Sequence, residues 1–199
     1  VTKLGDENYH GQGAFKGCTG INGVKIPNTI TTIGVGAFDG CVGLREVSIP
    51  NSVVTIDDRA FYECVGINFT IPNSVTEIGN NAFYGCVKMK LEMPDSVVSI
   101  GDNAFEGCTV SKTIKISKNV TTIGEDAFKG CLGITSLVVP DSVTTIGVGA
   151  FSNCKALKNV TLSNNLTAIK GATFKDCTSL QSIVIPDSVA IINALYSWG

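Results

Sequence analysis

The amino-acid sequence predicts a repeat solenoid, a stack of about eight coils of 22 to 23 residues each. Three observations predict this fold. Eight cysteines recur every 22 or 23 residues, a phenylalanine stands three residues before each cysteine, and an apolar stretch ending in proline closes most copies. One such unit cannot bury both of its faces, so copies must stack on one another. We therefore expect residues 1–199 to form a single domain, with an irregular first coil over 1–20 and an irregular end or cap over 187–199.

The cysteines and phenylalanines fix the phase of the repeat. The cysteines are Cys18, Cys41, Cys64, Cys86, Cys108, Cys131, Cys154 and Cys177. The phenylalanines are Phe15, Phe38, Phe61, Phe83, Phe105, Phe128, Phe151 and Phe174. The repeating unit reads L-x-x-V-x-I-P-x-S-V-T-x-I-G-x-x-A-F-x-G-C-x-x. Two copies are one residue short, between Cys64 and Ile71 and between Cys86 and Met93, which indicates a bend that tolerates deletions there.

Each segment of the unit predicts a local structure. The V-x-I stretch alternates, as a strand with one buried face does, and the proline after it ends the hydrogen-bond ladder. The S-V-T-x-I stretch predicts a second short strand, and the glycine after it permits a tight turn. The segment G-x-x-A-F-x-G-C is too short for a normal helix, so we expect one helical or 3-10 turn. Every strand runs the same way around its coil, so the sheets must be parallel, with strands about 4.8 Å apart.

Composition and charge exclude several classes of function. Hydrophobic residues make up 44% of the chain and charged residues only 16%, so much of the sequence must be buried. The net charge is −2, and the basic residues are scattered among the acidic ones, which argues against a nucleic-acid partner. No apolar run approaches the ~18 residues of a membrane span, so direct membrane insertion is not expected. The chain has neither an initiator methionine nor a signal sequence, which indicates a mature, trimmed or partial form.

Catalysis and cofactors are not expected either. The chain has one histidine, His10, and lacks a nucleophile–base set, a metal-ligand cluster and a phosphate-binding loop. His10 falls where the first copy departs from the repeat, so we interpret it as part of an irregular end coil. Acid pairs such as Asp57-Asp58 and Glu125-Asp126 offer calcium ligands, but they do not recur in every copy, and acids at the start of a turn need no ligand.

The eight cysteines allow three interpretations. Zinc sites need ligands at short spacing, and no two cysteines here are closer than 22 residues. Stacked copies would hold neighbouring Cβ atoms ~4.8 Å apart, beyond the ~3.5–4.5 Å that a disulfide prefers. We therefore predict a ladder of buried free thiols that pack as small hydrophobic side chains, with disulfides and metal binding as the less favoured alternatives.

The motif S-V-T-x-I-G-x-x-A-F-x-G-C-x-x-L-x-x-V-x-I-P resembles the BspA-type, or Treponema-type, leucine-rich repeat family. The copies at 94–108 (PDSVVSIGDNAFEGC) and 140–154 (PDSVTTIGVGAFSNC) carry it closely, and the resemblance extends from about Val1 to Val189. It implies a leucine-rich-repeat-like, right-handed coil. It further implies a bacterial or protist surface protein, located at the cell surface or outside the cell, that adheres to host proteins or to other cells.

The positions that vary between copies predict where a partner binds. In leucine-rich solenoids the V-x-I strand lines a concave sheet, and solenoids use extended concave surfaces for partners. We therefore hypothesise that a protein partner, whether a host, cell-surface or assembly protein, lies across this face. Its middle is mildly basic through Lys90, Lys112 and Lys115. The candidate residues are Lys25, Arg45, Glu46, Ser48, Thr70, Lys90, Glu92, Lys112, Lys115, Val138, Lys158, Thr161 and Val184.

Two alternatives to a surface module remain open. The first is an intracellular or assembly scaffold whose apolar ends associate end to end, because the last copy abandons the repeat after Ile192. The second is remote: threonines such as Thr31, Thr121 and Thr144 occupy matching places, and a flat threonine array can bind ice or glycans. Val54 interrupts that array, and threonine also simply suits strands.

Overall fold

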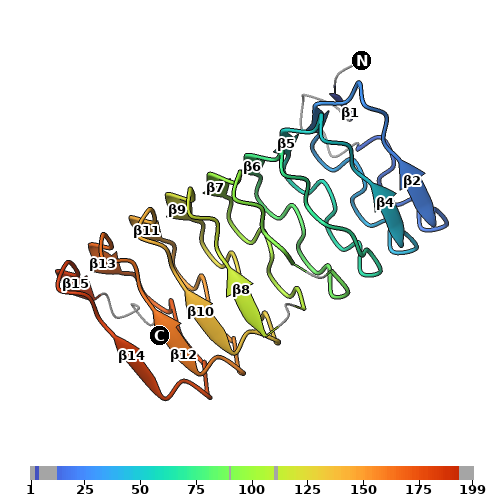
Figure 1. Ribbon diagram of the computed structural model, residues 1–199. Helices are drawn as coiled ribbons and strands as arrows, with labels where there is room; N and C mark the ends of the chain where they lie inside the picture. Colours follow the sequence, from blue (N-terminus) through green and yellow to red (C-terminus); the bar gives the residue numbers. More distant parts are fainter. Residues whose placement is uncertain (1–2, 5–12, 90, 110–111, 193–199) are drawn as a thin grey trace.

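The computed structural model describes residues 3–4, 13–89, 91–109 and 112–192 of the chain. The chain forms a β-solenoid of about seven turns in which every described pair of strands is parallel (Figure 1). The predicted repeat solenoid is therefore confirmed. Eight coils is a slight overcount, because complete coils run from 27 to 185 and the copies at the two ends form partial coils. His10, and residues 193–199 of the predicted end segment, lie outside the described residues.

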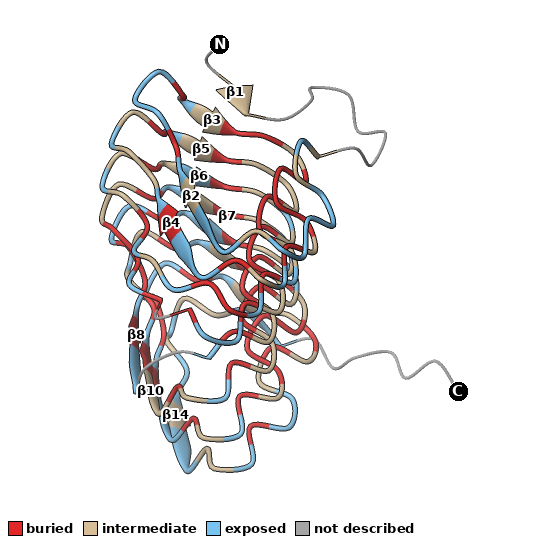
Figure 2. Cartoon of the chain, turned by 90° about the vertical axis from the view of Figure 1, so that its right-hand side faces the viewer, coloured by how far each residue is buried: buried red, intermediate tan, exposed pale blue. Residues whose placement is uncertain are grey.

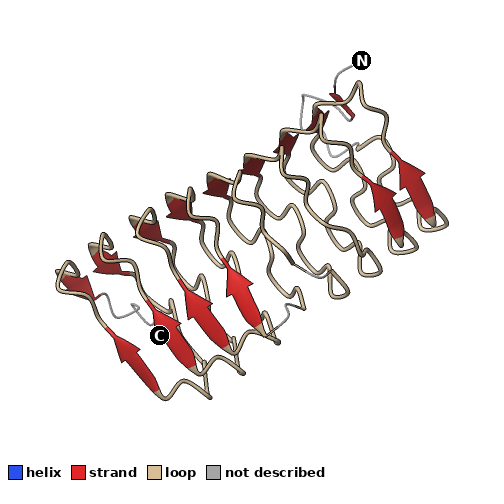
Figure 3. Ribbon diagram, viewed as in Figure 1, coloured by secondary structure: helices blue, strands red, loops and turns tan. Residues whose placement is uncertain are grey.

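A complete coil has two places where a strand can form, on different sides of the stack (Figure 3). The long strands, of three residues, are β2 (Gly23–Lys25), β4 (Glu46–Ser48), β8 (Thr113–Lys115), β10 (Ser136–Val138), β12 (Asn159–Thr161) and β14 (Ser182–Val184). The short strands, of two residues, are β1 (Lys3–Leu4), β3 (Thr32–Ile33), β5 (Thr55–Ile56), β6 (Glu77–Ile78), β7 (Ser99–Ile100), β9 (Thr122–Ile123), β11 (Thr145–Ile146), β13 (Ala168–Ile169) and β15 (Ile191–Ile192).

Identical repeat positions pair between neighbouring coils. Leu137 of β10, for example, lies between Ile114 of β8 and Val160 of β12. The short strands form a seven-stranded sheet in the order β1-β3-β5-β6-β7-β9-β11, and β13 pairs with β15. The long strands form a four-stranded sheet, β14-β12-β10-β8, and a separate pair, β2-β4. In-register pairing of like residues is what produces the predicted ladders.

The long-strand side is interrupted between β4 and β8. Residues 68–70 and 91–93 take no strand conformation, and both stretches belong to the copies that are one residue short. The deletion therefore falls between the turn that follows the repeat cysteine, at 65–66 and 87–88, and the stretch that is a long strand elsewhere. Phe69 occupies a core position in the first short copy, where its ring lies 5.4 Å from that of Phe61 and 5.8 Å from that of Phe83. Phe69 stands three residues before the repeat proline, as Val47 does in a full-length copy, so the missing residue leaves the same repeat position facing the core.

The segment G-x-x-A-F-x-G-C forms consecutive turns, and the expected helical or 3-10 turn is wrong: the described residues contain no helix. Two backbone positions in this segment have positive φ. In the coil before β4 they are Gly36 (φ 60) and Gly40 (φ 71), and in the next coil they are Arg59 (φ 55) and Glu63 (φ 53). A left-handed residue at every fourth position prevents a right-handed helix from propagating.

Hydrogen bonds give the same turn segment a role in joining the coils. The amides of Phe38 and Gly40 donate to the carbonyls of Ala60 and Tyr62 in the following coil, each at 2.8 Å. The amide of Cys41 instead closes a turn on the carbonyl of Phe38, at 3.0 Å. Because alternate amides point along the stack, the turns form a third inter-coil ladder beside the two strand ladders. A helix would have kept these hydrogen bonds within one coil.

The core is one apolar cluster that runs the length of the stack (Figure 2). The rings of the eight repeat phenylalanines stack face to face, from Phe15 to Phe174, with centroids 5.2 to 5.8 Å apart and planes within 10° of parallel. Six of them, from Phe38 to Phe151, are completely buried. Their burial stabilises the fold by on the order of 2 kcal/mol for each side chain.

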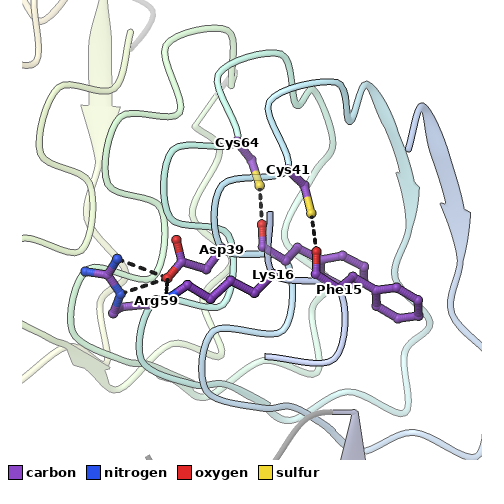
Figure 4. Close-up of polar contacts among 7 residues, drawn as sticks. Phe15, Lys16, Asp39, Cys41, Arg59 and Cys64 are labelled. Carbon is purple, nitrogen blue, oxygen red and sulfur yellow. Dashed lines mark hydrogen bonds and ion pairs between the residues drawn. The ribbon is translucent and has the colours of Figure 1, made fainter. Parts of the chain in front are cut away.

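All eight cysteines are free thiols, and seven of them are buried. Each buried thiol donates to the carbonyl of the phenylalanine in the preceding coil: Cys41 to Phe15 at 3.0 Å and Cys64 to Phe38 at 3.1 Å (Figure 4), with the remaining five at 3.1 to 3.3 Å. Cys18 departs from the expected buried ladder because it is exposed, in the first coil whose turn segment is described.

The surroundings of these thiols suppress their reactivity. Burial raises the pKa of Cys64, Cys108 and Cys154 to about 12, and it also raises the pKa of Cys41 and Cys177. The thiolate is the form that attacks electrophiles and binds metals. Thiols held protonated at neutral pH are therefore inert, and the cysteine ladder contributes packing and hydrogen bonds.

The left-handed turn positions can be tested at Gly107 (φ 72). A Cβ there would meet nothing closer than 3.9 Å, so Gly107→Ala isolates the backbone cost. We expect a loss of about 1–2 kcal/mol in the free energy of unfolding, measured by urea denaturation. Gly20→Ala is the matched control, because its Cβ would also have open space and its φ is not left-handed. Equal stability of the two variants would contradict the turn assignment.

Thiol accessibility gives a second prediction. We expect iodoacetamide at pH 7.5 to alkylate Cys18 in the folded protein while Cys108 and the other buried thiols stay unmodified, because they are both protonated and covered. Peptide mass spectrometry after brief labelling measures this, and labelling in urea provides the full-reaction control. Alkylation of Cys108 at the rate of Cys18 in the folded chain would show that the ladder is open.

Candidate functional site

The long strands position the side chains predicted to bind a partner. In β4, β8 and β12 a buried apolar residue stands between two exposed ones, so each strand directs its flanking side chains outward. Every described candidate is exposed, and Lys90 lies outside the described residues. The exposed candidates are Lys25, Arg45, Glu46, Ser48, Thr70, Glu92, Lys112, Lys115, Val138, Lys158, Thr161 and Val184.

The break in the long-strand side brings some of these residues around a hollow. A depression of about 760 Å³ lies between the two long-strand sheets and is lined by Thr70, Glu92 and Lys115, together with Asn51 and Asp95. Asn51 and Asp95 were not predicted from the sequence, because they follow the proline that ends the V-x-I stretch and lie outside it. Their position directly after the repeat proline, at Pro50-Asn51 and Pro94-Asp95, is the signal that would have found them.

A second hollow lies at the amino-terminal end of the same side. It measures about 510 Å³ and is lined by Lys25, Glu46, Ser48 and Asn68. Asn68 is two residues from Thr70, which lines the larger hollow, so the two depressions adjoin. Six of the predicted residues therefore border one interrupted groove that runs from β2 to β8.

The charges in this groove are more balanced than the sequence suggested. Lys115 Nζ lies 3.0 Å from Asp95 Oδ1, and Glu92 lines the same hollow. Lys115 is exposed and Asp95 is half-buried, so the ion pair is largely solvated and adds little to stability. The expected basic middle is thus a mixed-charge surface around Lys115.

Arg45 plays a packing role that its sequence position did not reveal. Its Nη1 donates to the carbonyl of Val42 at 2.7 Å and to that of Leu44 at 3.2 Å. The guanidinium also lies against Gly66, where a Cβ would overlap it. Arg45 is therefore anchored on its own coil and on the next one. Its guanidinium is less available to a partner than the ammonium groups of the exposed lysines are.

The alternative ligand sites have their polar groups engaged within the solenoid. Asp58 Oδ1 accepts the amide of Asn80, and Asp102 Oδ1 accepts that of Glu125, each at 2.7 Å, so these carboxylates tie one coil to the next. No group of three metal-ligating side chains occurs within the described ranges. On the threonine side, Thr144 Oγ1 lies 3.4 Å from the carbonyl of Thr121 in the preceding coil.

A cluster on the turn segments was not predicted from the sequence at all. Asp39 Oδ2 accepts hydrogen bonds from Arg59 Nε at 3.1 Å and Nη2 at 3.0 Å, and Lys16 Nζ lies 3.3 Å from it (Figure 4). The guanidinium of Arg59 lies 3.7 Å from the ring centroid of Tyr62, which stacks on Tyr84 at 4.7 Å. The signal was present, since Lys16, Asp39, Tyr62 and Tyr84 each directly follow a repeat phenylalanine.

Membrane insertion through a helix has no support in the part of the chain that the structure describes, where no helix is long and apolar enough to cross a bilayer.

Comparisons with known proteins agree with the repeat seen in the structure. The family model described as the BspA type leucine rich repeat region, with six copies, matches residues 8–91 and 76–196. A leucine rich cell surface protein from Faecalibacterium prausnitzii A2-165 is 30% identical with a TM-score of 0.57, over 90% of this chain and 52% of that one. This chain thus spans about half the length of that protein.

The T. pallidum leucine rich repeat protein is 27% identical with a TM-score of 0.63, over 85% of this chain and 72% of that one. The search of curated proteins finds no match. The family match extends over most of the chain and coincides with the coils of the solenoid. The chain belongs to the BspA-type leucine-rich repeat family.

Proposed function

We propose that this chain is a non-catalytic protein-interaction module of a surface or secreted protein, formed by one solenoid domain over residues 1–199, and that its partner lies along the long-strand side. The observation that carries the proposal is the interrupted groove, because six independently predicted residues border it. A repeat solenoid offers an extended surface on a rigid stack, which suits a protein partner better than a small substrate.

The chemistry of the groove supports a protein partner. The larger hollow combines the carboxylates of Glu92 and Asp95 with the ammonium of Lys115, and Thr70 and Asn51 add neutral hydrogen-bonding groups. Mixed polar surfaces of this kind are usual where proteins associate reversibly, since such interfaces are about as polar as the rest of a protein surface. The wide, open form of the groove suits an extended segment or an edge of a folded partner.

A location at the cell surface or outside the cell is supported by relationship, and a role in adhesion is the form of interaction that we propose there. The F. prausnitzii protein, 30% identical over 90% of this chain, is described as a cell surface protein.

The cysteines are compatible with either an oxidising or a reducing compartment. All eight are free thiols, and the coils are held together by burial of side chains and not by disulfides.

A second candidate function, assembly by stacking, is favoured by the carboxy-terminal coil. Its apolar side chains are unusually exposed: Ile191 by 54%, Ile192 by 63%, Val184 by 78% and Ile185 by 43%. A second copy of the chain would continue the ladder there. Analytical ultracentrifugation of the wild type and of Ile192→Asp tests this, with dimers and longer head-to-tail oligomers expected for the wild type only. A monomeric wild type at 100 μM would exclude stacking.

The interaction proposal predicts the effect of reversing two charges. Lys112→Glu with Lys115→Glu should weaken attachment of the fluorescently labelled chain to cells or proteins that it binds by about fivefold to tenfold, because two exposed charges each contribute up to ~1 kcal/mol. Lys155→Glu with Lys175→Glu is the matched control, since both lysines are exposed outside the groove. Flow cytometry measures attachment, and circular dichroism checks the fold. Unchanged affinity of the first variant, with the fold intact, would contradict binding on this side.

A further inference from the structure

The turn segments carry a ladder of polar and aromatic side chains that the proposed partner groove does not use. It consists of the residue that follows each repeat phenylalanine, so one member stands in each coil. The amino-terminal members are Lys16, Asp39, Tyr62 and Tyr84, and the next are Glu106 and Lys129. The turn segments containing Phe38, Ala60 and Ala82 are hydrogen-bonded coil to coil, which fixes the spacing of the ladder.

The first half of the ladder holds a guanidinium between a carboxylate and a tyrosine ring. Asp39, with its side chain only 8% exposed, accepts two hydrogen bonds from Arg59. The same guanidinium lies 3.7 Å from the centroid of the Tyr62 ring. The arrangement uses both properties of arginine, a planar face that stacks on aromatic rings and a fork of donors that matches a carboxylate.

The second half of the ladder also has a tyrosine ring and a carboxylate, those of Tyr84 and Glu106, and a hollow lies beside them. Tyr84 stacks on Tyr62 with planes 9° apart, so one face of its ring is covered. On the side toward the following coils, Tyr84 borders a hollow of about 390 Å³ that is also lined by Val87, Glu106 and Lys129. No other ring or arginine among the described residues stacks on Tyr84. The residue equivalent to Arg59 in this coil is Asn81, whose side chain is too short to reach over the ring.

We propose that this hollow binds the guanidinium of an arginine from a protein partner, stacked on the open face of Tyr84 and paired with the carboxylate of Glu106. The chain itself demonstrates the arrangement one coil earlier, with Arg59 between Tyr62 and Asp39. A guanidinium over a tyrosine ring gains cation–π attraction, and its weak hydration makes the transfer from water easier than for an ammonium.

The charges around the hollow suit an incoming cation. Lys129 Nζ lies 3.0 Å from Asp126 Oδ2 and 3.3 Å from Glu106 Oε1, so two carboxylates share one ammonium. Lys129 Nζ lies nearer to Asp126 Oδ2, to which it donates a hydrogen bond, than to Glu106 Oε1. Glu106 can therefore turn to a guanidinium while Lys129 stays paired with Asp126.

Short peptides in a titration followed by NMR test the proposal. The probes are the acetylated amides Gly-Arg-Gly, Gly-Lys-Gly and Gly-citrulline-Gly, added to the chain labelled with ¹³C in its tyrosine rings. We expect the Tyr84 resonance to shift with the arginine peptide at millimolar concentrations, at least about threefold weaker binding of the lysine peptide, and no binding of the uncharged citrulline peptide. Equal shifts with the arginine and citrulline peptides would overturn the proposal.

Variants of the chain separate the two contacts. Tyr84→Leu should abolish the arginine response read from the backbone amide of Gly107, whereas Tyr84→Phe should keep it because the ring remains. Glu106→Gln, which is isosteric, should weaken binding at least about fivefold, and Lys129→Met should strengthen it by removing the competitor for Glu106. Glu77→Gln, an exposed acid on β6, is the matched control and should change nothing. Arginine binding that survives Glu106→Gln unchanged would refute the site.

This site is independent of the proposed partner groove. Reversal of Lys112 and Lys115 should leave arginine binding as it is, and Tyr84→Leu should leave attachment through the groove as it is. The two experiments can therefore show that one proposal is wrong while the other one holds.

Discussion

Every coil depends on its neighbours for its backbone hydrogen bonds. Strand residues pair in register with the equivalent residues of the neighbouring coils, and alternate amides of the turn segments donate to carbonyls of the following coil, as Phe38 does to Ala60. Even side chains follow this rule, since each buried cysteine donates to a phenylalanine carbonyl one coil back. Unpaired buried amides and carbonyls are costly, so no single coil is stable alone. The ladders of phenylalanine, cysteine and isoleucine follow from this constraint, because in-register pairing superposes identical positions.

The same constraint explains what could and could not be predicted from the sequence. The period, the two strand positions and the parallel pairing follow from residue identity and spacing, so the solenoid was predictable. The conformation of the turn segment was not. Its length matches one helical turn, and the alternative depends on where the amides of Phe38 and Gly40 find acceptors, which lie in a coil 22 residues away. Residues such as Glu63, Asn81 and Ala172 also conceal their left-handed backbone, because glycine occupies these places only in some copies.

The candidate surfaces also combine features that were predictable from the sequence with features that were not. The exposure of the long-strand residues was predictable from the alternation, and the residues described in the structure follow it. The hollow between β4 and β8 was not, because it arises from how two short copies fail to form a strand. The anchoring of Arg45, and the contact of Arg59 with Asp39, depend on side-chain directions across coils. Such contacts leave no trace in the spacing of a single copy.

The in-register stack also sets the distances between surface features in steps of one coil. The groove and the Tyr84 hollow lie on different segments of the coil, and their separation along the stack is a whole number of coils, each about 4.8 Å thick. Gain or loss of a complete unit between two surface features would change their distance in steps of that size while leaving the core packing of every other coil unchanged. The two short copies show that a change of one residue acts differently, since it removes a strand and opens a depression. Whole-unit changes alter the distance between surface features, whereas single-residue changes alter the local shape of the surface.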